Sequence, residues 1–222
     1  MLKLRKGWIT SHVGSPLWRR VVVAFAKEHK LVYFRNIDHG KETTPVIRGS
    51  TSSPKQIDTN ICVGTHADYD ITLADRISET HFEGYETSLH RWYVLQIDLK
   101  RANNLPFIFV GTKQQTKAYY AGLLTSKRQL HHLMLETDAE KHSSFHGHYV
   151  VLSSPANSRL ISELFDQDMV NAMGEHLYPF SVEIENDSII VSTEAHKPSQ
   201  QLLNKLLHYG LWFAKEIDKK LN

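Results

Sequence analysis

The residues best suited to chemistry in this sequence are histidines, of which there are 14 among 222 residues. Two groups stand out by their spacing: His66, Asp68 and Asp70 alternate along one segment, and His146 and His148 alternate along another. Alternate residues of an extended strand share a face, and imidazole and carboxylate groups are ligands of divalent metals. This spacing indicates a metal site drawn from these residues, and with it a metal-assisted hydrolase.

Each group also has a purely structural interpretation. Asp68 and Asp70 can close a turn before a strand. His146 and His148 would share their strand face with the apolar Val150, as strand-edge residues do. A divalent metal is therefore one alternative, and a protein without any cofactor is the other.

Other catalytic groups have simpler explanations. Cys62, the sole cysteine, precedes a turn glycine and is typical of a small buried hydrophobic residue. Asp166 and Asp168 lie close together, but helix capping explains them. The chain contains no phosphate-binding loop, dinucleotide fingerprint, nucleophile elbow or H-E-x-x-H motif. We therefore expect no catalytic constellation, with the metal alternative left open.

Nucleic-acid binding is not favoured by the aromatic residues. Phe107, Phe109, Tyr119 and Tyr120 could stack on bases, but no arginines are interleaved with them. Core packing is the better interpretation of this set, and we expect no specific nucleic-acid partner.

The charges are divided unevenly along the chain, although the net charge is only +2. Residues 1–55 hold 11 lysines and arginines and 3 acidic residues, whereas residues 160–196 hold 8 acidic residues and neither lysine nor arginine. The two parts either attract each other within one fold or bind outside partners. The basic side would bind anionic surfaces weakly through Lys3, Arg5, Lys6, Arg19 and Arg20.

The sequence predicts a cytoplasmic protein without a membrane span. The longest apolar run, Val21–Ala26, is shorter than the core of a signal peptide, which needs about 7–15 residues. A membrane-spanning helix needs about 20. A single cysteine cannot form an internal disulfide, which suits a reducing compartment.

The pattern of apolar residues predicts an α+β fold, in which a mostly antiparallel sheet is flanked by helices. We expect a basic arm over residues 1–15 and a single α+β domain over 16–222. A helix comes first and a long amphipathic helix last, at 16–29 and 199–221. Strands are predicted at 31–34, 69–74, 90–99, 106–111, 146–152, 180–185 and 188–193, with helices at 115–124 and 157–165 and a short one from 166.

The most specific structural prediction concerns the last two strands. Asn186 and Asp187 tolerate positive φ and favour a two-residue turn. This turn pairs Ile184 with Ile189 and directs Glu183 to the opposite face of the sheet.

The order of these elements resembles that of a group of uncharacterised bacterial domains of unknown function. The residues that carry the resemblance are spaced apolar positions rather than a sharp motif: Trp18, Phe25-Ala26, Leu31–Tyr33, Asn104–Phe107, Phe145–Leu152, Leu164–Val170 and Phe180–Ser192. The break at Phe165-Asp166-Gln167 lacks the proline of that pattern. The resemblance implies an α+β fold and a bacterial source, and it implies no catalytic residue.

Three functions follow from these observations. The leading hypothesis is a non-catalytic binding or assembly domain, acting through a protein partner or self-association. The first alternative is the metal-assisted hydrolase, and the second is the weak binder of anionic surfaces.

Overall fold

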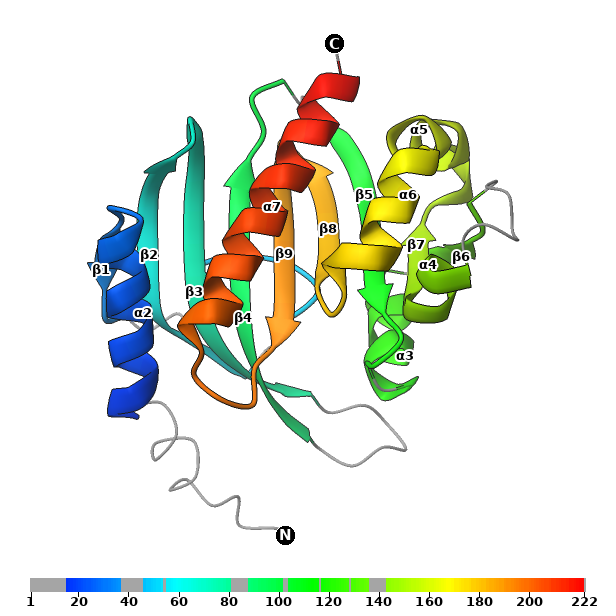
Figure 1. The fold of residues 1–222 in the computed structure, drawn as a ribbon. Coiled ribbons are helices and arrows are strands. Elements are labelled where there is room, and N and C mark those ends of the chain that lie inside the picture. The colour runs from blue at the N-terminus through cyan, green and yellow to red at the C-terminus, as the bar shows by residue number, and fades with distance from the viewer. Residues whose placement is uncertain are drawn as a thin grey trace, which may run out of the picture.

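A single antiparallel sheet organises the protein, and helices lie on both of its faces (Figure 1). The computed structural model describes residues 15–36, 46–53, 55–80, 88–101, 104–115, 117–127, 129–135 and 143–221. The predicted basic arm at residues 1–15, with Lys3, Arg5 and Lys6, lies outside this part of the chain except for Ser15.

Over the described residues the sheet has nine strands in the order β1-β2-β3-β4-β9-β8-β5-β7-β6, and neighbouring strands are antiparallel. The strands are β1 (Val32–Phe34), β2 (Gln56–His66), β3 (Tyr69–Thr80), β4 (Ser88–Asp98), β5 (Leu105–Thr112), β6 (His131–Leu133), β7 (Tyr149–Ser153), β8 (Ser181–Asn186) and β9 (Ser188–Glu194). The predicted α+β class, with a helix first and a long helix last, is confirmed.

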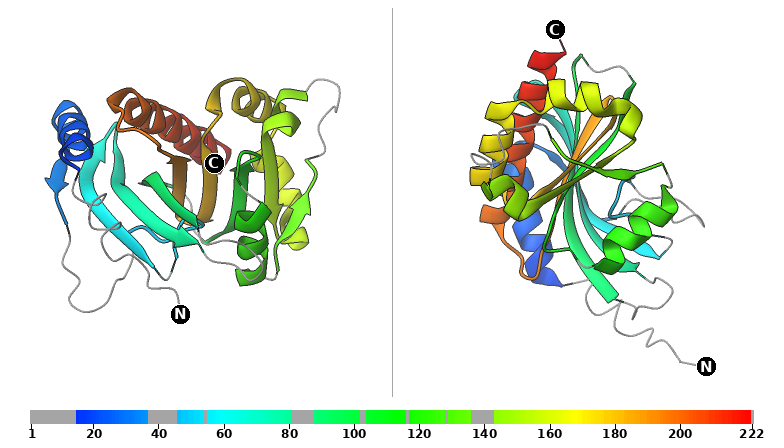
Figure 2. Two further views of the ribbon diagram at one scale, coloured as in Figure 1. Left: turned by 90° about the horizontal axis from the view of Figure 1, so that it is seen from below. Right: turned by 90° about the vertical axis from the view of Figure 1, so that its right-hand side faces the viewer.

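The helices divide unequally between the two faces of the sheet (Figure 2). They are α2 (Pro16–Glu28), α3 (Lys117–Ser126), α4 (Ser143–His148), α5 (Ser158–Leu164), α6 (Gln167–Ala172) and α7 (Gln200–Lys220), with a 3-10 turn at Pro155–Asn157 and a π-helical turn at Met173–Leu177. We call the face that carries α2, α7 and α4–α6 the helix face, and the opposite face, which carries α3, the loop face.

The helix face holds the larger apolar core. Side chains of alternate residues in β4, β8 and β9 point to it and meet the apolar stripe of α7. Gly210 lets α7 approach closely, because a Cβ at this position would lie 2.9 Å from Ile97 Cδ1. Members of this core include Phe25, Tyr93, Leu95, Ile97, Val182, Ile184, Val191, Leu206 and Phe213.

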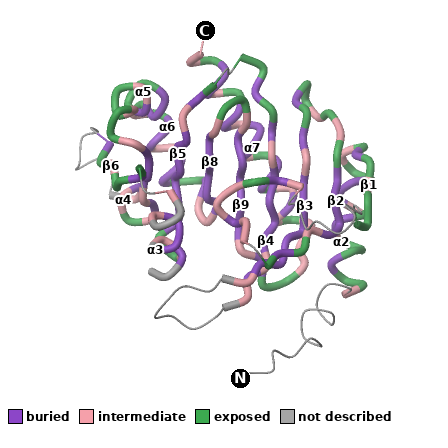
Figure 3. Tube along the Cα trace, turned by 180° about the vertical axis from the view of Figure 1, so that it is seen from behind, coloured by how far each residue is buried: buried purple, intermediate pink, exposed green. Residues whose placement is uncertain are grey.

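The loop face is closed by α3 and by the segment 46–53, which we call the cover loop. Ile47 of the cover loop is fully buried among aromatic and branched side chains of the sheet, including Trp92, Phe109 and Ile190. The central strands are buried along most of their length when seen from this side (Figure 3).

Arg76 of β3 holds the cover loop against the loop face of the sheet. Its side chain is fully buried, and all five N–H donors of the guanidinium are used. Nε and Nη2 donate to the carboxylate of Asp58 at 2.7 and 2.9 Å, Nη1 donates to Thr51 and Ser52, and Nη2 also donates to the carbonyl of Ile47. Because no donor is left over, Arg76 is a structural residue.

The predicted hairpin is confirmed in its register. Ile184 pairs with Ile189 and Val182 with Val191, and the turn residue Asn186 has φ 58°. Glu183 pairs with Ile190 on the loop face, opposite the core of the helix face.

The structure differs from the predicted elements at three places. Strands β2 and β6 were not predicted. The predicted strand at 146–152 begins only at Tyr149, because Ser143–His148 form the helix α4. Phe145 of α4 is buried in the core of the helix face, which fixes this short helix in place.

Candidate functional site

The first group of predicted metal ligands lies at the β2–β3 hairpin but does not share one strand face. His66 ends β2 and Asp70 belongs to β3, while Asp68 lies in the turn with φ 63°. The Asp70 carboxylate accepts a hydrogen bond from the hydroxyl of Thr65 at 2.6 Å. The turn interpretation of Asp68 is therefore the correct one.

The second group lies elsewhere. His146 and His148 are on α4, not on a strand, and the ring of His148 packs on Tyr178 with centroids 4.3 Å apart. The neighbouring strand β7 is five positions from β3 in the sheet, which corresponds to about 24 Å at the usual strand spacing. The structure thus does not bring the two groups together. Within the described ranges, no three His, Cys, Asp or Glu side chains are arranged to hold a metal ion.

The other candidate nucleophile and acids have structural roles. Cys62 is fully buried, and burial raises the pKa of its thiol to about 12, so it is protonated at neutral pH. Asp166 caps α6 by accepting a hydrogen bond from the backbone N–H of Met169 at 3.0 Å. The aromatic set Phe107, Phe109, Tyr119 and Tyr120 packs in the core of the loop face, as predicted.

The surface best equipped to bind a ligand is a groove along the outer side of α2. Its volume is about 540 Å³. Four cationic side chains line it over a small apolar floor, and none of its described lining residues is acidic. The residues are Pro16, Arg19, Arg20, Val23, Ala24, Lys27 and Arg35, and we call this the cationic groove.

The helical period places most of these cations together. The groove residues that α2 supplies, from Pro16 to Lys27, are spaced three and four positions apart, so they form one stripe along the outer side of the helix. The opposite stripe, with Trp18, Val22 and Phe25, is buried. Arg35 comes from the end of β1, which returns alongside the helix.

The N-terminal half of α2 is fixed to the sheet by Trp18. The guanidinium of Arg91 lies 3.6 Å from the centre of the Trp18 ring, and Tyr93 packs against the same ring at 5.4 Å. Arg91 is held in turn by the fully buried carboxylate of Asp75, to which its Nε donates at 2.8 Å.

The C-terminal end of α2 is fixed to α7. The carboxylate of Glu28 accepts hydrogen bonds from the side chains of Gln200 at 2.7 Å and Asn204 at 3.1 Å, and these bonds lower the pKa of Glu28. A ring nitrogen of His29 lies 3.1 Å from the amide oxygen of Asn204. Because both ends are tied down, the cationic groove is present before any ligand binds.

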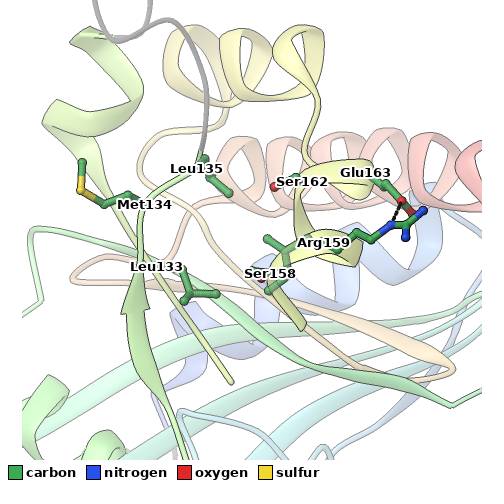
Figure 4. A pocket seen from close by; sticks show the side chains of 8 residues that line it. Leu133, Met134, Leu135, Ser158, Arg159, Ser162 and Glu163 are labelled. Atoms are coloured by element: carbon green, nitrogen blue, oxygen red, sulfur yellow. Dashed lines mark hydrogen bonds and ion pairs between the residues drawn. The ribbon is translucent and has the colours of Figure 1, made fainter. Parts of the chain in front are cut away.

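A second groove, at the other end of the sheet, has a different character (Figure 4). It lies between β6 and α5, has a volume of about 470 Å³ and an apolar floor that includes Leu133, Leu135 and Ile161. Its charged residues, Arg159 and Glu163, bind each other at 3.0 Å. Since its charges cancel, this groove has no preference for a charged partner.

The sequence anticipated part of the cationic groove. Arg19 and Arg20 were predicted to bind anions, whereas Lys27 and Arg35 were not singled out. Lys27 follows Arg20 by seven residues and could have been found from helical periodicity alone. Arg35 could not be found in this way, because its place in the groove depends on β1 lying beside α2.

The fold and the groove define an α+β domain with one antiparallel sheet and a preformed cationic surface. No protein-family model matches the chain, and no curated protein is detectably similar to it. Among solved structures, the chain is similar to the mycobacterial trehalose monomycolate transport factor A, TtfA, with a TM-score of 0.60 and 13% identity over 93% of this chain and 96% of that one. At this identity the similarity shows the fold alone.

None of the described helices is both long enough and apolar enough to cross a membrane.

Proposed function

We propose that the protein is a non-catalytic binding or assembly domain that engages an acidic partner through the cationic groove. The observation that carries the proposal is the set of four cations over an apolar floor, with no carboxylate among the described lining residues. Such a surface attracts anions over a distance and orients them on arrival.

Rigidity supports a binding role. α2 is fixed at one end by Trp18 and at the other by Glu28 and His29, so little conformational entropy is lost when a partner docks. The structural neighbour TtfA is called a transport factor, which agrees with an accessory role rather than catalysis. We place this binding in a bacterial cytoplasm, where a buried free thiol such as Cys62 stays reduced.

The experiment uses the full chain and fluorescein-labelled poly-glutamate as the probe. Reversing two groove charges with Arg20→Glu and Lys27→Glu should weaken binding at least about tenfold. Each cation contributes an attraction of about 1 kcal/mol at contact distance in water, and about 1.4 kcal/mol corresponds to a factor of ten. Binding should also weaken as salt is added.

A matched control keeps the change in net charge the same. Lys205 and Lys215 are exposed on α7, so Lys205→Glu with Lys215→Glu changes the charge equally outside the groove. If both double variants lose affinity to the same extent, the probe senses overall charge and the cationic groove is not the binding site.

A further inference from the structure

In the described part of the chain, no strand pairs with the outer edge of the sheet beside the cationic groove. β1 is an outermost strand, and within the described residues it pairs with β2 alone. The carbonyl of Arg35 accepts a hydrogen bond from the N–H of Asn60 in β2 at 2.9 Å. Backbone groups of an antiparallel pair alternate in direction, so the N–H and C=O groups of Val32 and Phe34 point away from β2.

The side chains at this edge are exposed and apolar. Val32 is 59% exposed and Phe34 43%, and their partners in β2 are Val63 and Ile61. Ile61 belongs to the core of the loop face, so these cross-strand partners lie on that side of the sheet. Tyr33, between them, packs on the helix face. The open backbone edge therefore runs between an apolar patch on one face and the cationic groove on the other.

We propose that an extended acidic segment of a protein partner adds to β1 as a tenth strand. This inference rests on the proposed function and specifies how the partner binds. The unpaired backbone groups of Val32 and Phe34 would bond to the added strand. Its acidic side chains would face Arg19, Arg20 and Arg35, and the alternate apolar side chains would cover the patch.

A strand fits this edge better than a lipid surface or a nucleic acid does. The cations and the apolar patch lie on opposite faces of the sheet, and a strand directs successive side chains to opposite faces. Nucleic acid would leave the apolar patch exposed. A lipid surface would leave the outward backbone groups of Val32 and Phe34 without partners, which is costly in an apolar medium.

The test measures binding of a short fluorescent peptide in which glutamate and valine alternate. Val32→Pro removes an outward N–H while leaving the bonds to β2, since proline is tolerated at an outer edge. We expect the peptide to bind at least about tenfold more weakly to this variant, as loss of a backbone hydrogen bond costs about 1 kcal/mol and the proline ring also crowds the incoming strand. Val32→Thr keeps the N–H and is the matched control.

The two proposals fail in different ways. Val32→Pro should weaken the peptide but not poly-glutamate, whereas the Arg20 and Lys27 reversals should weaken both. Unchanged peptide affinity in Val32→Pro overturns the added strand and leaves the cationic groove standing. Equal binding of a peptide with its glutamates and valines in separate blocks also overturns it, as does binding to phosphatidylserine vesicles without binding to the alternating peptide.

A second measurement covers the case in which Val32→Pro does not fold. The wild-type chain is then titrated with two alternating peptides, one N-methylated on its glutamates and the other on its valines, because alternate N–H groups point to opposite edges of a strand. Loss of binding for one of the two peptides supports strand addition, and retained binding of both contradicts it.

Discussion

The two faces of the sheet are buried by different means. The helix face is covered by long amphipathic helices, and its core is almost continuous apolar surface. The loop face is covered by α3 and the cover loop, and charged groups are buried in it, notably Arg76 and Glu183. Both faces pair their buried charges, Asp75 with Arg91 on the helix face and Arg76 with Asp58 on the loop face. On the loop face the buried cation also holds the cover loop in place.

This difference has a functional consequence. On the helix face the outer side of α2 carries cations, while the helix is held by its buried apolar stripe, by the contact of Arg91 with Trp18 and by the bonds of its C-terminal end to α7. On the loop face Arg76 uses all its donors internally and offers none to a ligand. The cations of the cationic groove and Arg76, which holds the cover loop, therefore belong to opposite faces.

Removing residues 199–222 should have the largest effect on the molecule. The deletion takes away α7 and with it at least five fully buried large side chains, each contributing about 1.5–3 kcal/mol. Their sum is comparable with the whole stability of a typical domain, so we expect a chain without a cooperative unfolding transition in urea. A truncated protein that melts at the wild-type temperature would show that α7 is not part of the core.

The corresponding test of the loop face is Arg76→Ala. The substitution leaves the nearly buried carboxylate of Asp58 without its counter-ion and frees the cover loop at Ile47, Thr51 and Ser52. We expect a loss of about 3–5 kcal/mol in the free energy of unfolding, measured by urea titration. A loss below about 1 kcal/mol would mean that the cover loop contributes little to closing this face.

The sequence predicted the helix face better than the loop face. Periodicity placed α2, α7 and the β8–β9 hairpin, including the pairing of Ile184 with Ile189, because each depends on local spacing. The cover loop could not be found in this way. Its position depends on contacts such as Ser50 with Glu183, which are far apart in sequence.

In the candidate site, too, the features that depend on local sequence were predicted and those that depend on distant contacts were not. Arg19 and Arg20 were recognised from local charge, and the hairpin turn at Asp68 follows from turn chemistry. The assignment of His146 and His148 to a strand is wrong, since both lie on α4, whose Phe145 is buried in the core of the helix face. Whether residues far apart along the chain converge depends on strand order, which apolar spacing does not encode.

Two glycines allow a smaller comparison between the faces. A Cβ at Gly111 would overlap the Phe109 ring and approach Tyr120 Oη to 2.6 Å, where that hydroxyl bonds to the carbonyl of Thr112. Gly111→Ala should therefore cost about 1–3 kcal/mol. Gly210→Ala meets the flexible end of Ile97 and gains about 1 kcal/mol of helix propensity, so its net effect on the melting temperature should be smaller. Equal losses in the two variants would contradict this ranking.

The smallest effect we predict is a pH dependence that originates at Glu183. Burial raises the pKa of this carboxyl group, although hydrogen bonds from Ser50 and the charge of Lys127 act against it. One carboxylate oxygen accepts from the N–H of Ser50 at 2.8 Å, while the other has no hydrogen-bond partner. A group with a raised pKa in the folded state favours folding below its unfolded pKa of about 4.3. That contribution is lost as the pH rises through the folded pKa.

Glu183→Gln removes this titration and keeps an acceptor for the N–H of Ser50. The free energy of unfolding of the variant, relative to the wild type, should therefore shift in favour of the variant between pH 4 and pH 7. Urea titrations of both proteins at several pH values measure this shift, and Glu175→Gln, at an exposed position in the π-helical turn, is the matched control. A difference between Glu183→Gln and the wild type that stays constant with pH would mean that Glu183 titrates alike in the folded and unfolded chains. In that case the loop face holds the carboxyl group without favouring its protonated form, and Glu183 contributes to the cover loop only through its hydrogen bond to Ser50.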